Sequence, residues 1–140
     1  CSSDLIHQLL PLSGKDLRVG DSEIALGSPN VYALRPASHL VSRQVVIRLT
    51  EVPRKPDGTL DKTAMAVSFA QEIQRQLAAK SVRAEVNIGT PKQVAVDGHR
   101  VLGFTVRLSG LSDTDSLLIQ AKGLGGKRAM GCGVFGPCRE

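Results

Sequence analysis

Aromatic residues are scarce in this chain of 140 residues, which has one tyrosine, three phenylalanines and no tryptophan. Sheet-type RNA-recognition modules stack unpaired bases on exposed aromatic side chains. Phe69 and Phe104 fall at apolar positions of a predicted helix and a predicted strand, so we expect both rings to be buried. The composition therefore argues against base stacking on a sheet surface.

Cysteine is almost as rare. The three residues Cys1, Cys132 and Cys138 are odd in number and form no C-x-x-C pair. A disulfide framework uses an even set of cysteines in an oxidising compartment, and a structural zinc site uses closely paired ligands. The sequence therefore predicts small thiols in a reducing cytoplasm, with no metal site and no cofactor.

Long apolar runs are missing as well. No stretch approaches the roughly 20 residues that cross a bilayer, and no secretory signal is visible, so we expect no membrane partner. The chain begins with Cys1 and not with methionine. We interpret it as a fragment or a processed product.

The first forty residues contain too few elements to build a core. The pattern predicts a short helix over residues 4–12, a hairpin over 17–26 that turns at Gly20-Asp21, and an extended piece over 31–34. We interpret residues 1–40 as the C-terminal remnant of a first domain. Residues 41–140 would then form a second domain.

From residue 43 the apolar pattern becomes regular. Val45, Ile47 and Leu49 alternate with polar residues, which indicates a half-buried strand, and a four-residue repeat from Met65 to Leu77 indicates a helix over residues 61–80. Further strands are predicted at 84–88, 102–108 and 132–135, with a connection or protruding hairpin at 89–98 and a capped helix starting at Ser112. The order β-α-β-β-α-β predicts an α+β, ferredoxin-like (RRM-like) domain. Both helices would cover one face of an antiparallel sheet, and the last strand would lie at its edge.

The open face of that sheet would carry polar side chains. These are Arg48, Thr50, Asn87, Thr105 and Arg107. For the two arginines, contact with RNA and an ordinary solvated or domain-contacting role are equally open.

Residues 122–135 form the most unusual stretch, with five glycines, three cations and no acidic residue. Glycine permits close approach to the main chain, and successive exposed N–H groups bind anions. Together with the formal net charge of +5, this predicts a site for a phosphate-bearing polymer or nucleotide. A helix C-cap at Gly123 followed by a flexible turn stays open as the alternative.

Two common phosphate loops do not fit this stretch. Gly126-Lys127 is followed by Arg128, where a Walker loop needs Ser or Thr, and the position five before Gly126 is Ala121. A dinucleotide fingerprint follows a strand and opens a helix, whereas this stretch follows a predicted helix.

The run Gly123-Leu124-Gly125, then five residues, then Gly131-Cys132-Gly133-Val134-Phe135 resembles a known motif. It is the C-terminal glycine-rich motif of the CRISPR-associated repeat-processing endoribonucleases, the Cas six family, and is most similar to the compact variety of MYXAN-type systems. Segments 9–15, 33–37 and 106–112 resemble that variety too, so the resemblance covers nearly the whole chain.

The resemblance implies two tandem ferredoxin-like domains that bind the repeat of precursor CRISPR RNA. It implies cleavage without metal, in which a 2′-hydroxyl attacks the adjacent phosphate and leaves a cyclic phosphate and a 5′-hydroxyl. It also implies RNA-binding residues in the glycine motif, with glycines that shape the loop and expose N–H groups and cations that neutralise phosphates. These residues are Lys122, Gly123, Gly125, Gly126, Lys127, Arg128, Gly131 and Gly133. Lys92, Arg100, Arg54 and Lys55 are weaker candidates for RNA contacts.

The family's histidine, a general base or acid, lies near the first helix of the first domain. That region would precede Cys1, so the catalytic residue is unassigned in this chain. His7 reads as a surface helix residue, His39 lies between the predicted domains, and His99 follows a turn.

Three functions stay open at this point. The first is an endoribonuclease of CRISPR repeat RNA, present here as its C-terminal portion. The second is a non-cleaving RNA-binding subunit that works beside other subunits of a type I effector complex. The third is a ferredoxin-like domain that binds a small ligand or a protein, with the glycine stretch as a simple turn.

Overall fold

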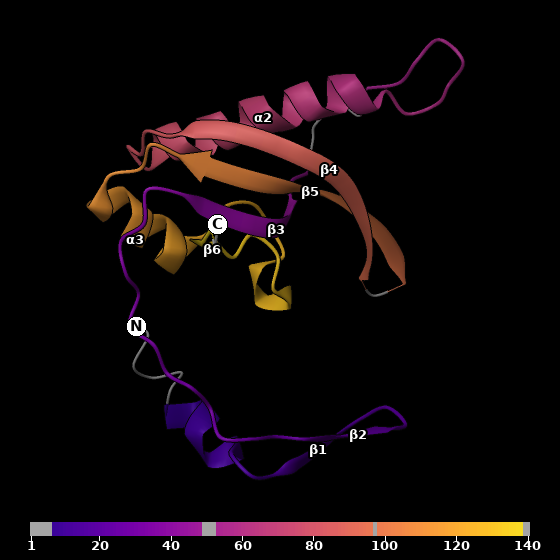
Figure 1. Cartoon of the computed structure of the whole chain (residues 1–140). Helices are drawn as coiled ribbons and strands as arrows, with labels where there is room; N and C mark the ends of the chain where they lie inside the picture. Colours follow the sequence, from indigo (N-terminus) through magenta and orange to yellow (C-terminus); the bar gives the residue numbers. More distant parts are fainter. Residues whose placement is uncertain (1–6, 49–52, 97, 139–140) are drawn as a thin grey trace. The chain divides into compact units, whose positions relative to one another are not determined.

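The computed structural model describes residues 7–48, 53–96 and 98–138. The chain folds as two units, residues 1–33 and residues 34–140 (Figure 1). In the described ranges, no helix has both the length and the apolar character needed to cross a bilayer.

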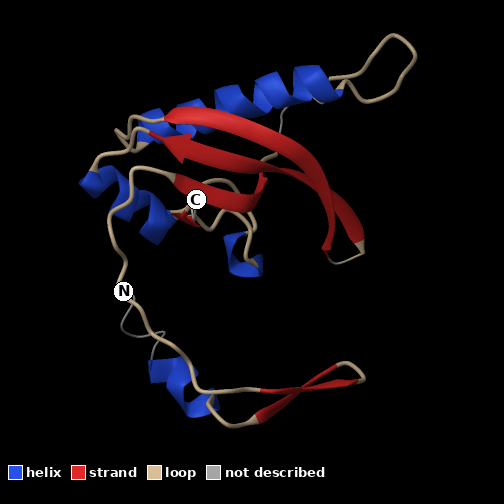
Figure 2. Ribbon diagram, viewed as in Figure 1, coloured by secondary structure: helices blue, strands red, loops and turns tan. Residues whose placement is uncertain are grey.

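The first unit is a helical turn followed by a β-hairpin (Figure 2). Residues 7–9 are helical, and the 3-10 turn η1 (Leu10–Leu12) follows them. β1 (Asp16–Val19) pairs antiparallel with β2 (Ser22–Ala25), with Gly20-Asp21 as the turn, so the predicted hairpin is confirmed. The predicted helix over 4–12 lies partly outside the described residues. Its end is a 3-10 turn and not an α-helix, because Pro11 lacks the N–H that an α-helical bond needs.

Within the first unit, nothing covers either face of the hairpin. No described residue of this unit is buried, and Leu17, Val19 and Ile24 are 37%, 60% and 46% exposed. A two-stranded hairpin without a packed face is marginally stable in water. Residues 31–34, predicted to be extended, lie in a stretch without regular secondary structure.

The second unit has the predicted order β-α-β-β-α-β. Its elements are β3 (Leu40–Val46), α2 (Lys62–Ala79), β4 (Glu85–Val96), β5 (His99–Ser109), α3 (Asp113–Lys122) and β6 (Gly136–Pro137). The strand order is β4-β5-β3-β6, and all three pairings are antiparallel. This is the ferredoxin-like topology with the final strand at an edge, so the predicted fold class is confirmed.

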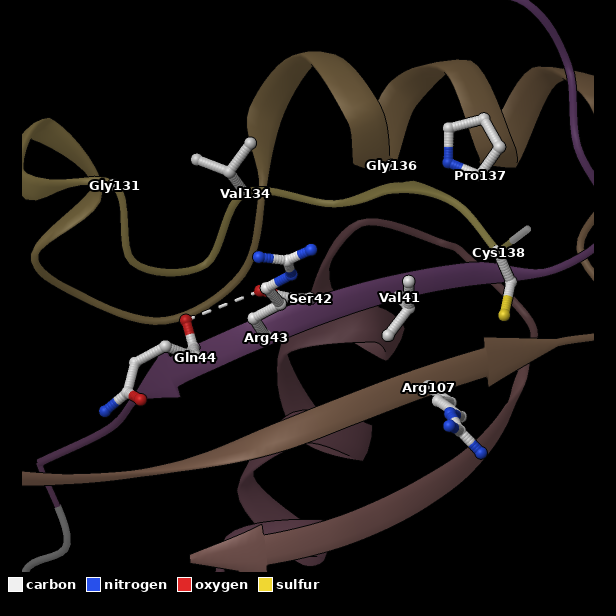
Figure 3. Close-up of a pocket in the computed structure, with 10 residues that line it drawn as sticks. All are labelled: Val41, Ser42, Arg43, Gln44, Arg107, Gly131, Val134, Gly136, Pro137 and Cys138. Carbon is white, nitrogen blue, oxygen red and sulfur yellow. Dashed lines mark hydrogen bonds between the residues drawn. The ribbon is translucent and has the colours of Figure 1, made fainter. Parts of the chain in front are cut away.

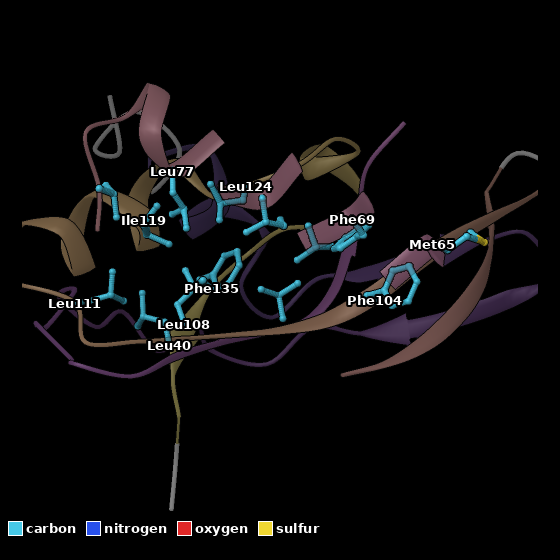
Figure 4. Close-up of a cluster of buried hydrophobic side chains, with 14 residues drawn as sticks. Leu40, Met65, Phe69, Leu77, Phe104, Leu108, Leu111, Ile119, Leu124 and Phe135 are labelled. Atoms are coloured by element: carbon cyan, nitrogen blue, oxygen red, sulfur yellow. The ribbon is translucent and has the colours of Figure 1, made fainter. Parts of the chain in front are cut away.

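Both helices pack on the same face of the sheet. α2 contributes Met65, Phe69, Ile73 and Leu77, and α3 contributes Ile119, to one apolar cluster that contains Leu40, Val45, Phe104, Val106 and Leu108 from the strands. Figure 4 shows these side chains gathered between helices and strands. The Phe69 and Phe104 rings lie 4.6 Å apart, centroid to centroid. Because both rings are at most 3% exposed, neither can stack a base.

Each helix begins at a polar side chain. Asp61 accepts hydrogen bonds from the N–H groups of Thr63 and Ala64, and Ser112 accepts one from Asp115. These caps satisfy amides that the first turn leaves without intrahelical partners. The predicted starts of both helices are therefore confirmed.

Residues 89–98 are not a connection, which corrects one alternative of the prediction. β4 continues to Val96 and β5 begins at His99, so the two strands form one long hairpin. A register shift between Ile88 and Pro91 marks the irregularity that a proline imposes on an edge strand. The hairpin curves away from α2 on the side where that helix starts (Figure 1).

Two predicted strands are displaced. β3 begins at Leu40, before the predicted start at residue 43, and ends at Val46. Val45 and Ile47 contact the core and Arg48 is exposed, as predicted, whereas Leu49 lies outside the described residues. The alternation is not strict, because Val46 is also buried and a register shift lies between Ser42 and Val45. The last strand is β6, not residues 132–135, since Gly133 has φ +68°, which an extended strand does not accommodate. Cys132 and Phe135 are buried by a turn and not by strand alternation.

Candidate nucleic-acid interface

The glycine stretch lies between α3 and β6, as predicted. Gly123 ends α3 with φ +65°, and its N–H donates to the Ile119 carbonyl, the bond expected of a glycine C-cap. Arg128–Met130 then form the 3-10 turn η2. The stretch is thus a structured loop, which we call the terminal loop (residues 123–135).

The N–H groups of its glycines are used within the protein. Gly125 donates to the Gln76 side chain at 2.8 Å, Gly126 to the Val46 carbonyl at 2.8 Å, and Gly133 to the Gln44 carbonyl at 2.7 Å. The expected exposure of glycine N–H groups is therefore wrong for all five glycines of the stretch, each of which has an internal acceptor: Gly123, Gly125, Gly126, Gly131 and Gly133.

Glycine is required here for a steric reason. A Cβ atom on Gly133 would collide with the Leu124 carbonyl oxygen, and one on Gly123 would collide with the Gly133 carbonyl. On Gly125 it would come within 2.5 Å of the Val46 oxygen. The loop can therefore lie flat against β3 and against itself only without side chains at these positions.

The cations of the terminal region remain at the surface. Lys122, Lys127 and Arg128 are all exposed. Arg128 Nη1 donates to the Lys122 carbonyl at 2.6 Å, which places a cation at the negative end of α3. Lys127 has a left-handed backbone, φ 57° and ψ 30°, which is unusual for a residue with a side chain.

A hollow of about 750 Å³ lies where the loop meets the open face of the sheet. We call it the basic hollow (Figure 3). Arg43 of β3 and Arg107 of β5 supply its charge, while Gly131 and Val134 of the terminal loop form another part of its wall. The described lining residues are Val41, Ser42, Arg43, Gln44, Arg107, Gly131, Val134, Gly136, Pro137 and Cys138.

The charge of the basic hollow is not balanced by the described residues. None of the lining residues that the structure describes is acidic. The one ion pair in the part of the chain that the structure describes joins Arg75 to Glu72, so Arg43 and Arg107 have no carboxylate partner there. Two exposed guanidinium groups beside an apolar wall suit a phosphate and its sugar.

A second, smaller hollow of about 220 Å³ lies on the helix side of the same loop. It is lined by Arg75 and Lys80 of the α2 end and by Arg128 of the loop. The terminal loop thus separates two hollows, and its cations are not confined to one of them.

The remaining predicted contacts are scattered. Asn87 of β4 lies opposite Arg107 of β5, and Thr105 donates its hydroxyl to the Arg43 carbonyl at 3.1 Å. Arg48 is exposed and follows the end of β3, and Thr50 lies outside the described residues. Arg54 donates to the Gly58 carbonyl at 2.9 Å. Lys55 and Lys92 are exposed, and Arg100 belongs to β5.

Of the histidines whose side chains the structure describes, neither His7 nor His39 lines the basic hollow. His7 and His39 are exposed, and His39 Nδ1 lies 2.9 Å from the Ser38 hydroxyl. His99 opens β5 opposite Val96. Cys132 is buried and not in a disulfide. In the described ranges, no three His, Cys, Asp or Glu side chains group as a metal site would require.

Sequence reasoning missed three contributors to this region. Arg43 reaches the open face because of the register shift in β3, and strict alternation cannot reveal such a shift. Gln44 and Gln76 accept hydrogen bonds from the terminal loop across long sequence separations. No local pattern in the sequence signals either glutamine.

Comparison with known proteins gives consistent results. A family model described as Cas6, Cas6 Crispr, matches residues 1–140. A protein of Myxococcus xanthus (strain DK1622) named CRISPR-associated endonuclease Cas6 is 34% identical over 137 residues, which cover 98% of this chain and 54% of the relative. The chain therefore spans about half the length of that curated relative.

Proposed function

This chain belongs to the Cas6 family, and we propose that it is the C-terminal part of a protein that binds and cuts CRISPR repeat RNA. The substrate would be precursor CRISPR RNA in the cytoplasm, and the product mature crRNA. The Myxococcus xanthus relative is named an endonuclease, which supports this assignment. The partners would be the repeat RNA and, after processing, the other subunits of a type I effector complex.

The basic hollow is the observation that carries the proposal. Arg43, Arg107 and the exposed Lys127 place positive charge around the junction of sheet and loop. Cations that neutralise phosphates release counterions, which drives binding to RNA of any sequence. Lys122, Gly126, Arg128 and Gly131, all exposed, complete the proposed RNA contacts. The buried Gly123 and Gly133 and the half-buried Gly125 would support the loop and not touch RNA.

The chemistry proposed for the whole protein needs no metal. A base takes the proton of a 2′-hydroxyl, the oxygen attacks the neighbouring phosphorus, and an acid gives a proton to the departing 5′-oxygen. Negative charge that develops on the phosphate would be stabilised by nearby cations, here Lys127 and Arg128. The base and acid are unassigned within this chain.

We propose that residues 1–40 are the tail of a preceding ferredoxin-like domain. Leu17, Val19 and Ile24 of the hairpin are exposed, and an apolar hairpin face needs a partner layer. The relative is nearly twice as long as this chain, which leaves sequence for such a layer.

A non-cleaving RNA-binding subunit is the second candidate. It is favoured by one observation, that neither His7 nor His39, the histidines whose side chains the structure describes, lines the basic hollow or the smaller hollow beside Arg128. In that case the same cations would hold the repeat without cutting it.

The test uses the full-length natural protein and the CRISPR repeat RNA of its source organism. In buffer with EDTA we expect cleavage that leaves a cyclic phosphate and a 5′-hydroxyl. Cleavage that requires added Mg²⁺ would show that the proposed mechanism is wrong. A gel shift without product would support the second candidate, and the absence of both would exclude both.

A further inference from the structure

Gln76 joins α2 to the terminal loop. Its Oε1 accepts the Gly125 N–H at 2.8 Å, and its Nε2 donates to Glu72 Oε1 at 3.0 Å. The carboxylate of Glu72 can only accept, so it fixes which end of the Gln76 amide faces the loop. The acceptor oxygen is thereby held toward Gly125.

Glu72 is itself held by Arg75. The Nε and Nη2 atoms of Arg75 donate to the two carboxylate oxygens, each at 2.7 Å. Hydrogen bonds from Arg75 and then Gln76 lower the pKa of Glu72 to about 2, so this carboxyl is ionised at neutral pH. Arg75, Glu72, Gln76 and the Gly125 N–H therefore form one continuous chain of hydrogen bonds.

Gly125 is also where the loop lies against the sheet. A Cβ there would come within 2.9 Å of Val45 Cγ1, and the next residue, Gly126, donates to the Val46 carbonyl at 2.8 Å. The loop is thus fixed from the helix by Gln76 and from β3 by Val46. Lys127 and Arg128 follow directly after these two attachments.

We propose that Gln76 is a positioning residue for RNA binding, which acts by holding Lys127 and Arg128 in their binding geometry. This inference rests on the proposed RNA-binding function and adds a residue that does not itself contact RNA. A loop ordered before binding loses less conformational entropy when RNA binds. Release of the Gly125 attachment would let the two cations sample other positions.

The decisive comparison uses Gln76→Met, which keeps the side-chain length and removes the acceptor. Its matched rescue is the double variant Glu72→Gln with Gln76→Glu, which exchanges the two residues and conserves the net charge. The carboxylate at position 76 would accept the Gly125 N–H, and the amide at position 72 would donate to that carboxylate. The measurements, on the full-length protein, are hydrogen exchange at the Gly125 amide and affinity for repeat RNA at several salt concentrations. Circular dichroism confirms that each variant is folded at the assay temperature.

We expect Gln76→Met to speed exchange at Gly125 and to weaken RNA binding by roughly threefold to tenfold, the factor that one net hydrogen bond supplies. The salt slope should not change, because no phosphate contact is removed. The exchange variant should restore both slow exchange and affinity.

A merely structural role predicts a different result. If Gln76→Met speeds exchange or lowers the melting temperature while a folded sample binds RNA as tightly as the wild type, the positioning role is wrong. If the wild-type protein binds no RNA, the proposed function fails and the positioning role fails with it. The two failures are therefore distinguishable, because normal RNA binding by Gln76→Met contradicts only the positioning role, whereas absent binding by the wild type contradicts the proposed function as well.

Discussion

Two glycines of the terminal loop have similar backbone angles and very different surroundings. Gly131 has φ +80° and nothing within 4 Å of the place a Cβ would occupy, whereas at Gly133, with φ +68°, a Cβ would meet the Leu124 carbonyl. The first needs glycine for its backbone alone, and the second for its backbone and its packing.

Alanine at these two positions separates the two requirements. We expect Gly131→Ala to lower the free energy of unfolding by about 1 kcal/mol, the cost of a left-handed backbone. Gly133→Ala should cost about 3 kcal/mol or more, because a collision in a packed region is added. Urea unfolding at constant m-value measures both. Equal losses in the two variants would contradict the observed packing.

Lys127 carries a side chain at a position that suits glycine. Its φ is +57°, and Ser81, outside the proposed interface, has the same angle, which makes Ser81 a matched control. We expect Lys127→Gly and Ser81→Gly each to stabilise the protein by about 0.5 to 1 kcal/mol, since the left-handed strain is relieved and some chain entropy is lost. Thermal unfolding measures this gain.

RNA binding should distinguish the two variants. Lys127→Gly should weaken binding and reduce the salt slope by about one unit, as the loss of one phosphate contact predicts. Ser81→Gly should bind as the wild type does. If Lys127→Gly also binds normally, Lys127 makes no phosphate contact.

Among the secondary-structure elements, the sequence was most informative where a regular apolar repeat continues over many residues. The four-residue repeat and Asp61 located α2, and Ser112 located the start of α3. It was least informative where one residue breaks the period. The register shift after Ser42 and the positive φ of Gly133 move strands by a few residues, and neither changes the local composition.

The contribution of Glu72 to the stability of α2 should depend on pH. Its pKa falls from 4.5 to about 2 on folding, so the stabilisation is complete above the unfolded value and is lost as pH falls toward 2. We expect wild type to be more stable than Glu72→Gln at pH 6, and the difference to shrink between about pH 4.5 and pH 2. Urea midpoints at several pH values measure it. A difference that stays constant across this range would contradict the role of the ionised carboxylate.

Over the chain as a whole, the cations of the terminal loop could be predicted from composition, but the basic hollow could not. The hollow joins β3, β5 and the residues after η2, and only the tertiary fold brings Arg43 beside Val134. The glycines were located correctly, while their role as tightly packed backbone depends on carbonyls from distant segments. A single sequence does not reveal such contacts.

The exposed hairpin of the first unit leads to a prediction about the full-length protein. Ile24, 46% exposed here, would face the proposed preceding domain. We expect Ile24→Asp to leave the stability of the 140-residue chain unchanged and to lower that of the full-length protein by about 2 kcal/mol or more, because a charge would be buried.

The control for this prediction is Val67→Asp on α2, where the side chain is 55% exposed. It should have little effect on either protein. Thermal unfolding of both lengths measures the outcome. If Ile24→Asp is equally harmless in the full-length protein, the hairpin is not covered by a preceding domain.

The account depends most on whether the basic hollow binds the RNA backbone. The direct test measures how the affinity for repeat RNA depends on salt concentration in two double variants. The first pair, Arg43→Gln with Arg107→Gln, removes the charge of the hollow. The second pair, Lys62→Gln with Arg83→Gln, removes the same charge from exposed sites outside the hollow. We predict that the first pair reduces the slope of log K against log salt by about two units, and that the second pair leaves it close to wild type. Equal slopes for the two pairs would contradict the account.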